Sequence, residues 1–259
     1  MKLRDTHTHL DGEEFAGDLP EVIARAREAG VSKVFLPAVD LDSVHSVLKV
    51  CRQYPGYAFP MIGLHPEEVK ADWQKVLEQM QAIGTEGFIA IGEVGLDFYW
   101  SREFAHEQQE AFEEQVRWSV ATGLPLMIHC RKAQNEMVKI LRRYESKLPG
   151  GVFHCFTGNA VEAEELLSFD RFVLGIGGVL TFKNSHLPEV LHQTVPLSRV
   201  VLETDSPYMA PVPMRGHRNE SAYVTYVLEK LSECYGVEPR EVAVQTNQNA
   251  ERVFGLHED

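Results

Sequence analysis

The chain lacks the features that mark secreted, membrane and dithiol redox proteins. Its four cysteines, at positions 51, 130, 155 and 234, form no CxxC pair, so neither a zinc ribbon nor a redox motif is indicated. No apolar run approaches the roughly 20 residues that a membrane helix needs. The first residues contain no apolar signal-peptide core. We therefore expect a cytoplasmic protein with free thiols and no membrane partner.

Positive charge is scarce as well. The chain has 25 Lys and Arg against 38 Asp and Glu, and its formal net charge is -13. A protein that coats nucleic acid would carry the opposite balance. The charge favours a small-molecule substrate, but an enzyme with a local basic rim around its site can still act on nucleic acid.

Short apolar runs alternate with helical patterns along the whole chain. Runs joined by helices predict parallel strands with right-handed crossovers. Eight runs in 259 residues favour a closed (β/α)8 TIM barrel of the α/β class, which typically has about 250 residues. An open doubly wound sheet is the alternative, but no GxGxxG follows an early run. We predict a single barrel domain over residues 1–259, with no obligate protein partner. The runs are residues 3–9, 34–39, 57–64, 88–93, 126–129, 152–154, 172–178 and 200–205.

Histidines and acids recur at matching places in these runs. His7 and His9 share one face of the first run, because strand side chains alternate. In a barrel, the carboxyl ends of the strands form one mouth, so these residues would converge. A single buried histidine is more often a hydrogen-bonded core residue, but the joint pattern predicts a divalent metal site. The residues that end later runs are His65, Glu93, His129, His154 and Asp205.

Six short motifs occur in order across the chain. They are DTHTHL at 5–10, GLHP at 63–66, GEVGLD at 92–97, MIHCR at 127–131, FHCFTG at 153–158 and ETDSPY at 203–208. As a set they resemble the TatD family of metal-dependent hydrolases, within the amidohydrolase superfamily. The resemblance implies a TIM barrel with up to two divalent ions and a deoxyribonuclease activity on phosphodiesters, often as a 3′-to-5′ exonuclease.

The resemblance also implies the ligands of each ion. His7, His9, Glu93 and Asp205 match the ligands of the first metal. Glu93, His129 and His154 match those of the second, so Glu93 would bridge the two. His65 matches a residue that contacts substrate or solvent.

Glu93 and Asp205 are the predicted catalytic residues. A paired metal site lowers the pKa of a bound water. Asp205 could orient this water and accept its proton, or it could serve purely as a ligand. Glu203, on the same strand face, is expected to orient a ligand or to accept a buried hydrogen bond. Four imidazoles favour zinc or manganese over magnesium, although the family is usually assayed with magnesium.

Groups that suit a phosphoester follow the same strand ends. Arg131 offers a cation, Thr157 a hydroxyl and Gly158 a backbone amide. The aromatic residues of these loops could stack on bases or simply cover the barrel; they are Phe98, Tyr99, Trp100 and Tyr208. The other cations expected at this rim are Lys132, Lys183, Arg215, His217 and Arg218.

Three functions are compatible with these residues. The first is a metal-dependent phosphodiesterase that acts on DNA ends. The second is a small-molecule hydrolase with an amide, lactone or phosphomonoester substrate, and the third is a non-catalytic binding scaffold. Many amide-cleaving relatives carry a carboxylated lysine where this chain has Glu93, which favours the first. After the eighth run, family members often have Arg-Asn-Glu-Pro, whereas residues 218–221 read Arg-Asn-Glu-Ser.

Overall fold

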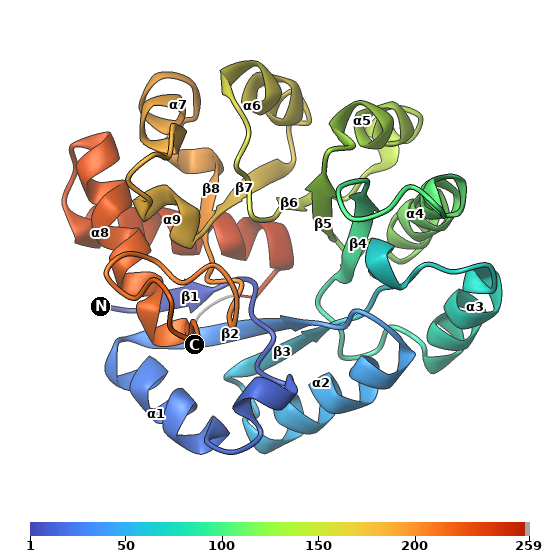
Figure 1. Ribbon diagram of the computed structural model, residues 1–259, viewed down its shortest axis with the longest axis horizontal. Helices are drawn as coiled ribbons and strands as arrows, with labels where there is room; N and C mark the ends of the chain where they lie inside the picture. The colour runs from blue at the N-terminus through green and yellow to red at the C-terminus, as the bar shows by residue number, and fades with distance from the viewer. Residues whose placement is uncertain (257–259) are drawn as a thin grey trace.

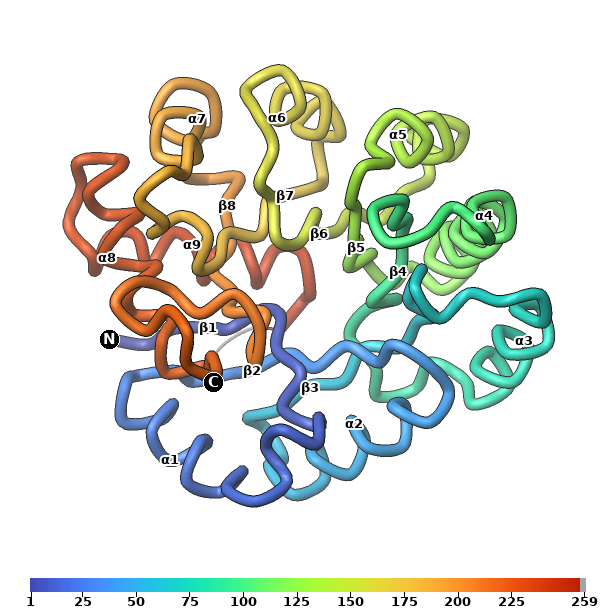
Figure 2. The backbone as a smooth tube through the Cα atoms, viewed as in Figure 1, coloured from blue at the N-terminus to red at the C-terminus, as the bar shows by residue number. Residues whose placement is uncertain are grey.

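The structure is a computed structural model that describes residues 1–256, so the end of the predicted 1–259 domain lies outside it. Parallel strands alternate with helices, and the helices surround the strands (Figure 1). Figure 2 follows the backbone as it passes repeatedly between the centre and this outer ring. The strands are β1 (Leu3–Asp5), β2 (Val31–Pro37), β3 (Ala58–Met61), β4 (Ile91–Asp97), β5 (Leu126–Arg131), β6 (Gly151–Phe153), β7 (Phe172–Ile176) and β8 (Val200–Leu202). The α-helices are α1 (Leu19–Glu28), α2 (Leu41–Gln53), α3 (Trp73–Ile83), α4 (Ala105–Thr122), α5 (Gln134–Arg142), α6 (Ala160–Leu167), α7 (Leu187–Thr194), α8 (Val224–Tyr235) and α9 (Pro239–Phe254).

The strands close into a barrel. Regular pairing gives two sheets, β1-β2-β3 and β4-β5-β6-β7-β8, with every pair parallel. A bridge between Ile62 and Ile91 joins β3 to β4, and a bridge between Thr8 and Ser206 joins the chain after β1 to the chain after β8. The predicted (β/α)8 barrel is therefore confirmed, and the open doubly wound sheet is wrong.

Several strand boundaries differ from the predicted runs. Strand β5 continues past His129 to Arg131, and β8 stops at Leu202, before Asp205. The apolar run stops at Glu93 because glycine and acidic residues follow, yet the whole of β4 is buried and continues to Asp97. The expectation that Glu93 ends its strand is therefore wrong. Gly95 allows this pairing: its φ is +144°, and a Cβ there would collide with the carbonyl oxygen of His129 on β5. Strand β1 ends at Asp5, so the predicted ligands His7 and His9 follow the strand instead of lying in it.

Capping boxes start two of the helices that lead away from the strand ends. Ser43 N donates to Asp40 Oδ1 at 2.7 Å, and Asp40 N donates to Ser43 Oγ at 2.9 Å, at the start of α2. Asn159 and Glu162 form the same box at the start of α6. These reciprocal bonds fix the loops that follow β2 and β6, at the barrel end where the predicted ligands lie.

A compact apolar layer closes the other end of the barrel. Helix α9 contacts β1, β6 and β8 and contributes Ala250 and Phe254 to this layer. Val152 on β6 and Val201 on β8 belong to this layer. His154 and Glu203, two positions further along the chain, face the same interior. The barrel interior therefore has an apolar floor below the predicted ligands. The buried residues of the layer are Phe35, Met61, Ile89, Ala90, Met127, Val152, Val173, Val201, Ala250 and Phe254.

Two further features concern the cysteines and the helices. All four cysteines are free and partly buried. Within residues 1–256, no helix combines the length and the apolar character needed to cross a bilayer.

Candidate metal centre

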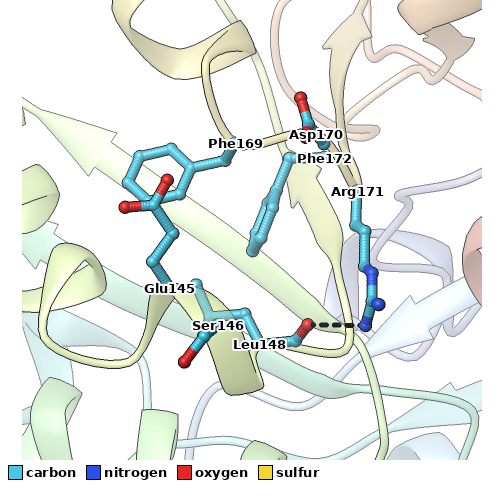
Figure 3. A pocket seen from close by; sticks show the side chains of 7 residues that line it. All are labelled: Glu145, Ser146, Leu148, Phe169, Asp170, Arg171 and Phe172. Atoms are coloured by element: carbon cyan, nitrogen blue, oxygen red, sulfur yellow. Dashed lines mark hydrogen bonds between the residues drawn. The ribbon is translucent and has the colours of Figure 1, made fainter.

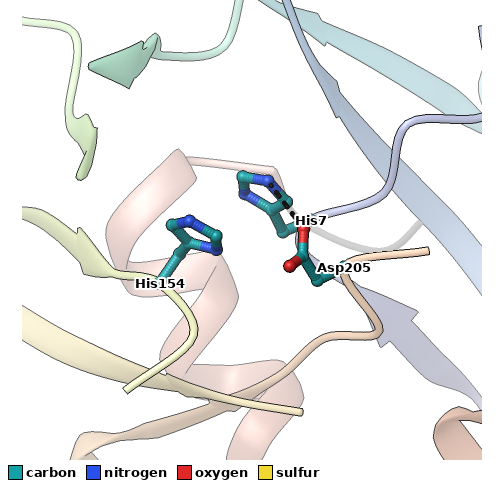
Figure 4. Close-up of side chains that lie close together, drawn as sticks. All are labelled: His7, His154 and Asp205. Carbon is teal, nitrogen blue, oxygen red and sulfur yellow. Dashed lines mark ion pairs between the residues drawn. The ribbon is translucent and has the colours of Figure 1, made fainter. Parts of the chain in front are cut away.

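The six predicted metal ligands meet at the carboxyl end of the barrel. They come from distant parts of the chain, as Figure 4 shows for His7 after β1, His154 after β6 and Asp205 after β8. The His7 and His154 rings stack with centroids 3.9 Å apart and planes 7° apart. His7 Nε2 lies 3.6 Å from Asp205 Oδ1. These contacts place imidazoles and a carboxylate from three strand ends in one cluster.

Glu93 lies at the centre of the cluster, and its two oxygens face different histidines. Oε2 lies 3.1 Å from His7 Nε2 and 3.6 Å from His9 Nε2. Oε1 lies 2.8 Å from His154 Nε2 and 3.1 Å from His129 Nδ1. The division matches the two ligand sets that the family resemblance implies.

Asp205 completes the first of these sets. Its Oδ1 lies 3.6 Å from the Nε2 atoms of both His7 and His9. Its side chain is 15% exposed, whereas that of Glu93 is 3% exposed. Asp205 is therefore the cluster carboxylate that solvent and a substrate can reach more easily.

His65 lies closer to the cluster than a substrate contact requires. Its Nε2 is 3.3 Å from Glu93 Oε1, and its Nδ1 accepts a hydrogen bond from Glu67 N at 3.2 Å. His65, Glu93 and His129 can offer ligand atoms that all lie within 4.8 Å of one another. By distance His65 lies within reach of a cation, but the hydrogen bond to Nδ1 leaves the proton of the neutral ring on Nε2, which faces Glu93.

The cluster has the donor atoms that a divalent cation needs. His7 Nε2 and His9 Nε2 lie only 3.2 Å apart, and His129 Nδ1 and His154 Nε2 lie 3.3 Å apart. Each close pair of nitrogens has an oxygen of Glu93 beside it. Imidazole nitrogens with carboxylate oxygens are the ligands that zinc and similar ions take. The residues therefore fit a divalent metal.

The charges of the cluster are strongly coupled. Burial raises the pKa of Glu93, but the surrounding histidines, His154 foremost, outweigh burial and hold this pKa well below its usual range. Burial lowers the pKa of His154, but Glu93 and Glu203 outweigh it and raise this pKa well above its usual range. Burial and the neighbouring His154 lower the pKa of His7. Glu93 is thus an ionised, buried carboxylate that requires positive charge beside it, as a metal ion would supply.

Asp97 belongs to the site although it was not among the predicted site residues. It is 1% exposed, and its Oδ2 lies 2.9 Å from His129 Nε2. Because an ionised carboxylate only accepts, His129 donates to Asp97 through Nε2, and a metal ion beside Glu93 would then take the lone pair of Nδ1. A strand period of two, continued past Glu93 to Gly95 and Asp97, is the signal that would have found it.

Glu203 lies behind His154, as the sequence led us to expect. It is fully buried, its Oε1 accepts a hydrogen bond from Cys155 N at 2.5 Å, and the same oxygen is 3.6 Å from His154 Nδ1. Gly175 on β7 leaves room for it, since a Cβ at that position would overlap the Glu203 carboxylate. The carboxylate holds the backbone turn that follows His154.

Asp5 is a second buried acid that the prediction missed. Its Oδ1 accepts from Thr204 N at 2.8 Å, and its Oδ2 accepts from Thr204 Oγ1 at 2.6 Å. These bonds tie the end of β1 to the chain between β8 and Asp205. Burial raises the pKa of Asp5 to about 7, although the hydroxyl partners lower it. Asp5 therefore joins the two segments that carry the ligands of the first predicted metal.

The predicted substrate contacts have varied surroundings. Arg131 is exposed and lies over the Tyr99 ring, with its guanidinium carbon 3.7 Å from the ring centroid. Thr157 is exposed, and the carbonyl oxygen of Gly158 accepts from His186 Nε2 at 3.2 Å. Both follow β6, near the cluster in sequence, but no contact of the structure tests their roles.

Some of the expected rim cations are engaged elsewhere. Arg218 donates to Asp18 through two nitrogens, at 2.9 and 2.6 Å, so it is an ion-pair partner of the loop before α1. Arg215 lies over the Phe182 ring at 3.8 Å. The neighbouring Asn219 is fully buried, and its side chain donates to the Thr204 and Tyr208 carbonyls at 2.8 and 2.7 Å. The segment after β8 therefore holds the site together.

A separate hollow opens near the beginning of β6 and β7 (Figure 3). Arg171 Nη1 donates to the Leu148 carbonyl across it, at 3.3 Å. Strands begin at this end of the barrel, whereas the predicted ligands follow strand ends. None of its lining residues is a histidine or a cysteine, so we assign no chemistry to it. They are Glu145, Ser146, Leu148, Phe169, Asp170, Arg171 and Phe172.

Residues 4–255 match the family described as TatD related DNase. The chain belongs to this TatD family. The family is described as DNases, and one relative is named a metal-dependent hydrolase. Together with the cluster of possible metal ligands, this makes the chain a hydrolytic enzyme that acts on phosphoester bonds and uses divalent metal.

Known members of the TatD family cover nearly the whole chain. The chain is 35% identical over 256 residues to "Uncharacterized metal-dependent hydrolase YabD" of Bacillus subtilis (strain 168), covering 98% of this chain and 100% of the relative. It is 31% identical over 259 residues to "3'-5' ssDNA/RNA exonuclease TatD" of Citrobacter rodentium (strain ICC168), covering 97% of each. The crystal structure of YJJV, a TatD homolog from Escherichia coli k12, superposes with a TM-score of 0.91 at 28% identity over 98% of both chains.

Proposed function

We propose that this protein is a 3′-to-5′ exonuclease that removes nucleotides from single-stranded DNA or RNA. The observation that carries the proposal is the position of Glu93, whose two oxygens face two separate groups of histidines. This arrangement suits a pair of metals on either side of one phosphodiester. Relatives named "3'-5' ssDNA/RNA exonuclease TatD" support the choice of substrate.

We assign two divalent ions to the cluster. His7, His9 and Asp205 would hold the first, His129 and His154 the second, and Glu93 both. When bound, such ions supply a water of lowered pKa and polarise the phosphoryl oxygen. Nitrogen ligands favour zinc or manganese, and magnesium is the alternative.

The protein's own residues divide the remaining work. Burial raises the pKa of Asp205, but a hydrogen bond from His9 and the nearby histidines outweigh it and lower this pKa, so the carboxylate is ionised. Because Asp205 is also the more exposed carboxylate, it would take the proton of the attacking water. Arg131, Thr157 and Gly158 would contact the phosphate, and Asp97 would keep His129 in the correct tautomer.

We also propose that the chain is one catalytic domain that works in the cytoplasm. The match to the TatD family over residues 4–255 supports one domain for the whole chain. The competing function is hydrolysis of a small phosphomonoester or amide, which the net charge of -13 favours.

A labelled oligonucleotide tests the proposal. The metal-free enzyme is supplied with Mn²⁺, Zn²⁺ or Mg²⁺ in turn and given single-stranded DNA labelled at its 5′ end. We expect a ladder of products that shorten from the 3′ end. The Glu93→Gln variant should lose at least about 100-fold in kcat, because the carboxylate that joins the two sets loses its charge.

A matched control and a competing substrate complete the test. His106→Ala removes a histidine that is 80% exposed on α4, and it should leave the ladder unchanged. Absence of metal-dependent cleavage with every ion, together with turnover of p-nitrophenyl phosphate, would exclude the exonuclease and favour the small-molecule hydrolase.

A further inference from the structure

We propose that Tyr99, Trp100 and Arg131 form a platform on which unpaired bases stack next to the phosphodiester that is cleaved. The inference rests on the proposed exonuclease function and adds the element that would recognise single strands. In a duplex, base faces are covered by their neighbours, whereas a single strand can offer them to aromatic rings.

The exposed aromatic side chains lie at the barrel end that carries the metal cluster. Among residues 1–256, the aromatic side chains classed as exposed are Tyr99, Trp100 and Tyr208, at 50%, 67% and 56%. All three lie in loops that follow β4 or β8, at the barrel end that carries the metal cluster. Large exposed aromatic side chains at a site mouth are typical of ligand contacts.

Two aromatic residues of the same loop show the difference between covering the barrel and facing solvent. Phe98 is only 7% exposed and belongs to the apolar core, so it fulfils the covering role. Trp100 follows it by two positions and remains two-thirds exposed, with its ring centroid 4.8 Å from that of Tyr99 at an interplanar angle of 83°. The Tyr99 and Trp100 rings thus remain available to a ligand.

The platform is fixed in position relative to the metal ligands. Asp97 Oδ2 lies 2.9 Å from His129 Nε2, and its Oδ1 accepts from Tyr99 N at 2.8 Å. One buried carboxylate therefore holds both a ligand of the cluster and the first residue of the aromatic pair. Phe98 N donates to the Arg131 carbonyl at 2.9 Å, which ties the loop to the end of β5. A base on the platform would lie beside the phosphate bound at the metals.

Arg131 supplies the positive charge that a nucleic-acid backbone needs. Its guanidinium carbon lies 3.7 Å from the Tyr99 centroid and 5.2 Å from the Trp100 centroid. None of the ion pairs found in the described part of the chain involves Arg131, so its donors are not committed to a carboxylate. A guanidinium held against aromatic rings combines phosphate binding with base stacking, as in single-strand binding proteins.

The test compares two oligonucleotides that differ only in their bases. One is oligo(dT), and the other carries abasic tetrahydrofuran residues at its 3′ end. The measured quantity is the ratio of kcat/KM for the first to that for the second. We expect the wild-type ratio to be about 10 to 100, and Trp100→Ala and Tyr99→Ala to lower it at least about 5-fold, mainly through KM. Trp100→Phe should restore most of the ratio.

Tryptophan fluorescence gives a reading that does not depend on turnover. Trp73 and Trp118 are 7% and 9% exposed, so quenching of the metal-loaded protein by a cleavage-resistant phosphorothioate oligo(dT) would report mainly Trp100. The quenching should disappear when Trp100→Phe is added. Val161→Ala is the matched control, because Val161 is 74% exposed on α6 and should leave both the ratio and the quenching unchanged.

The outcomes separate the platform from the exonuclease. A wild-type enzyme that degrades both oligonucleotides equally well, or a ratio that survives Trp100→Ala and Tyr99→Ala, would overturn the platform and leave the exonuclease in place. A wild-type enzyme that degrades neither oligonucleotide with any ion would overturn the exonuclease itself, and the platform with it.

Discussion

Replacing Asp5 by asparagine should change how the stability of the protein depends on pH. The Asp5 carboxyl is fully buried, and it accepts two hydrogen bonds from Thr204. Burial raises its pKa from 3.8 to about 7. The folded protein therefore keeps a proton on Asp5 over a pH range in which the unfolded chain has released it.

The sign and the size of the effect follow from that difference. Folding raises the pKa of this acid, so the protonated form of Asp5 stabilises the folded state. This stabilisation is fully present below about pH 4 and is lost as the pH rises to about 7. The whole loss is about 4 kcal/mol, at 1.36 kcal/mol for each pH unit between the two pKa values. Between about pH 5 and pH 8 the loss amounts to about 2.5 kcal/mol.

The asparagine side chain reproduces the neutral form of Asp5. Its Oδ1 can accept from Thr204 N, and its Nδ2 can donate to Thr204 Oγ1, which can turn its own proton to Ser206 Oγ at 3.2 Å. The charge that would otherwise be buried above pH 7 is absent. As the pH rises from about 5 to about 8, the free energy of unfolding of Asp5→Asn should therefore increase by about 2.5 kcal/mol relative to that of the wild type.

The assay is urea unfolding of both proteins, metal-free in chelator, at a series of pH values across this range. The histidines of the cluster titrate in both proteins, so the difference between the two stability curves isolates Asp5. Parallel curves would refute the reasoning, because they would mean that Asp5 is equally ionised in the folded and the unfolded state.

Two further substitutions test the residues behind the metal ligands. Asp97→Asn should weaken metal binding by about 10- to 100-fold, measured by calorimetry, because His129 loses the carboxylate that fixes its tautomer. Unchanged affinity would exclude this role, and Glu103→Gln, an exposed acid in the loop after β4, is the control. Gly175→Ala should destabilise the protein by about 1–3 kcal/mol, measured by urea unfolding, because the new Cβ would overlap the Glu203 carboxylate. Gly177→Ala is its control, since a Cβ there meets only ordinary contacts from about 3.5 Å; equal stability of the two variants would contradict the steric argument.

The sequence predicted the barrel and the convergence of the ligands because both depend on repetition. Eight apolar runs with chemistry at equivalent ends leave few other arrangements, and His7, His129 and His154 do meet around Glu93. What repetition could not supply was the boundary of β4, since Gly92 and Gly95 interrupt the apolar pattern where the strand continues. Asp97 was missed for this reason.

The loops were predicted less well than the strand ends. Arg218 and Arg131 were both expected at the rim, yet Arg218 pairs with Asp18 and Arg131 lies on Tyr99. Partners such as Asp18 are distant in sequence, and no periodicity relates loop residues to one another. Asp5 was missed in a similar way, because its partner Thr204 lies at the other end of the chain.

The acidic composition and a nucleic-acid substrate are compatible once the position of the acids is considered. Glu93, Asp97, Glu203 and Asp205 all lie in or directly behind the cluster, so part of the net charge of -13 is concentrated at the site itself. Two divalent ions would offset four of these negative charges exactly where a phosphate must approach. Without them, only Arg131 and the cationic form of His154 would oppose these carboxylates, and no metal would hold the phosphoryl oxygen. The metals would therefore be needed for substrate binding as well as for the chemistry.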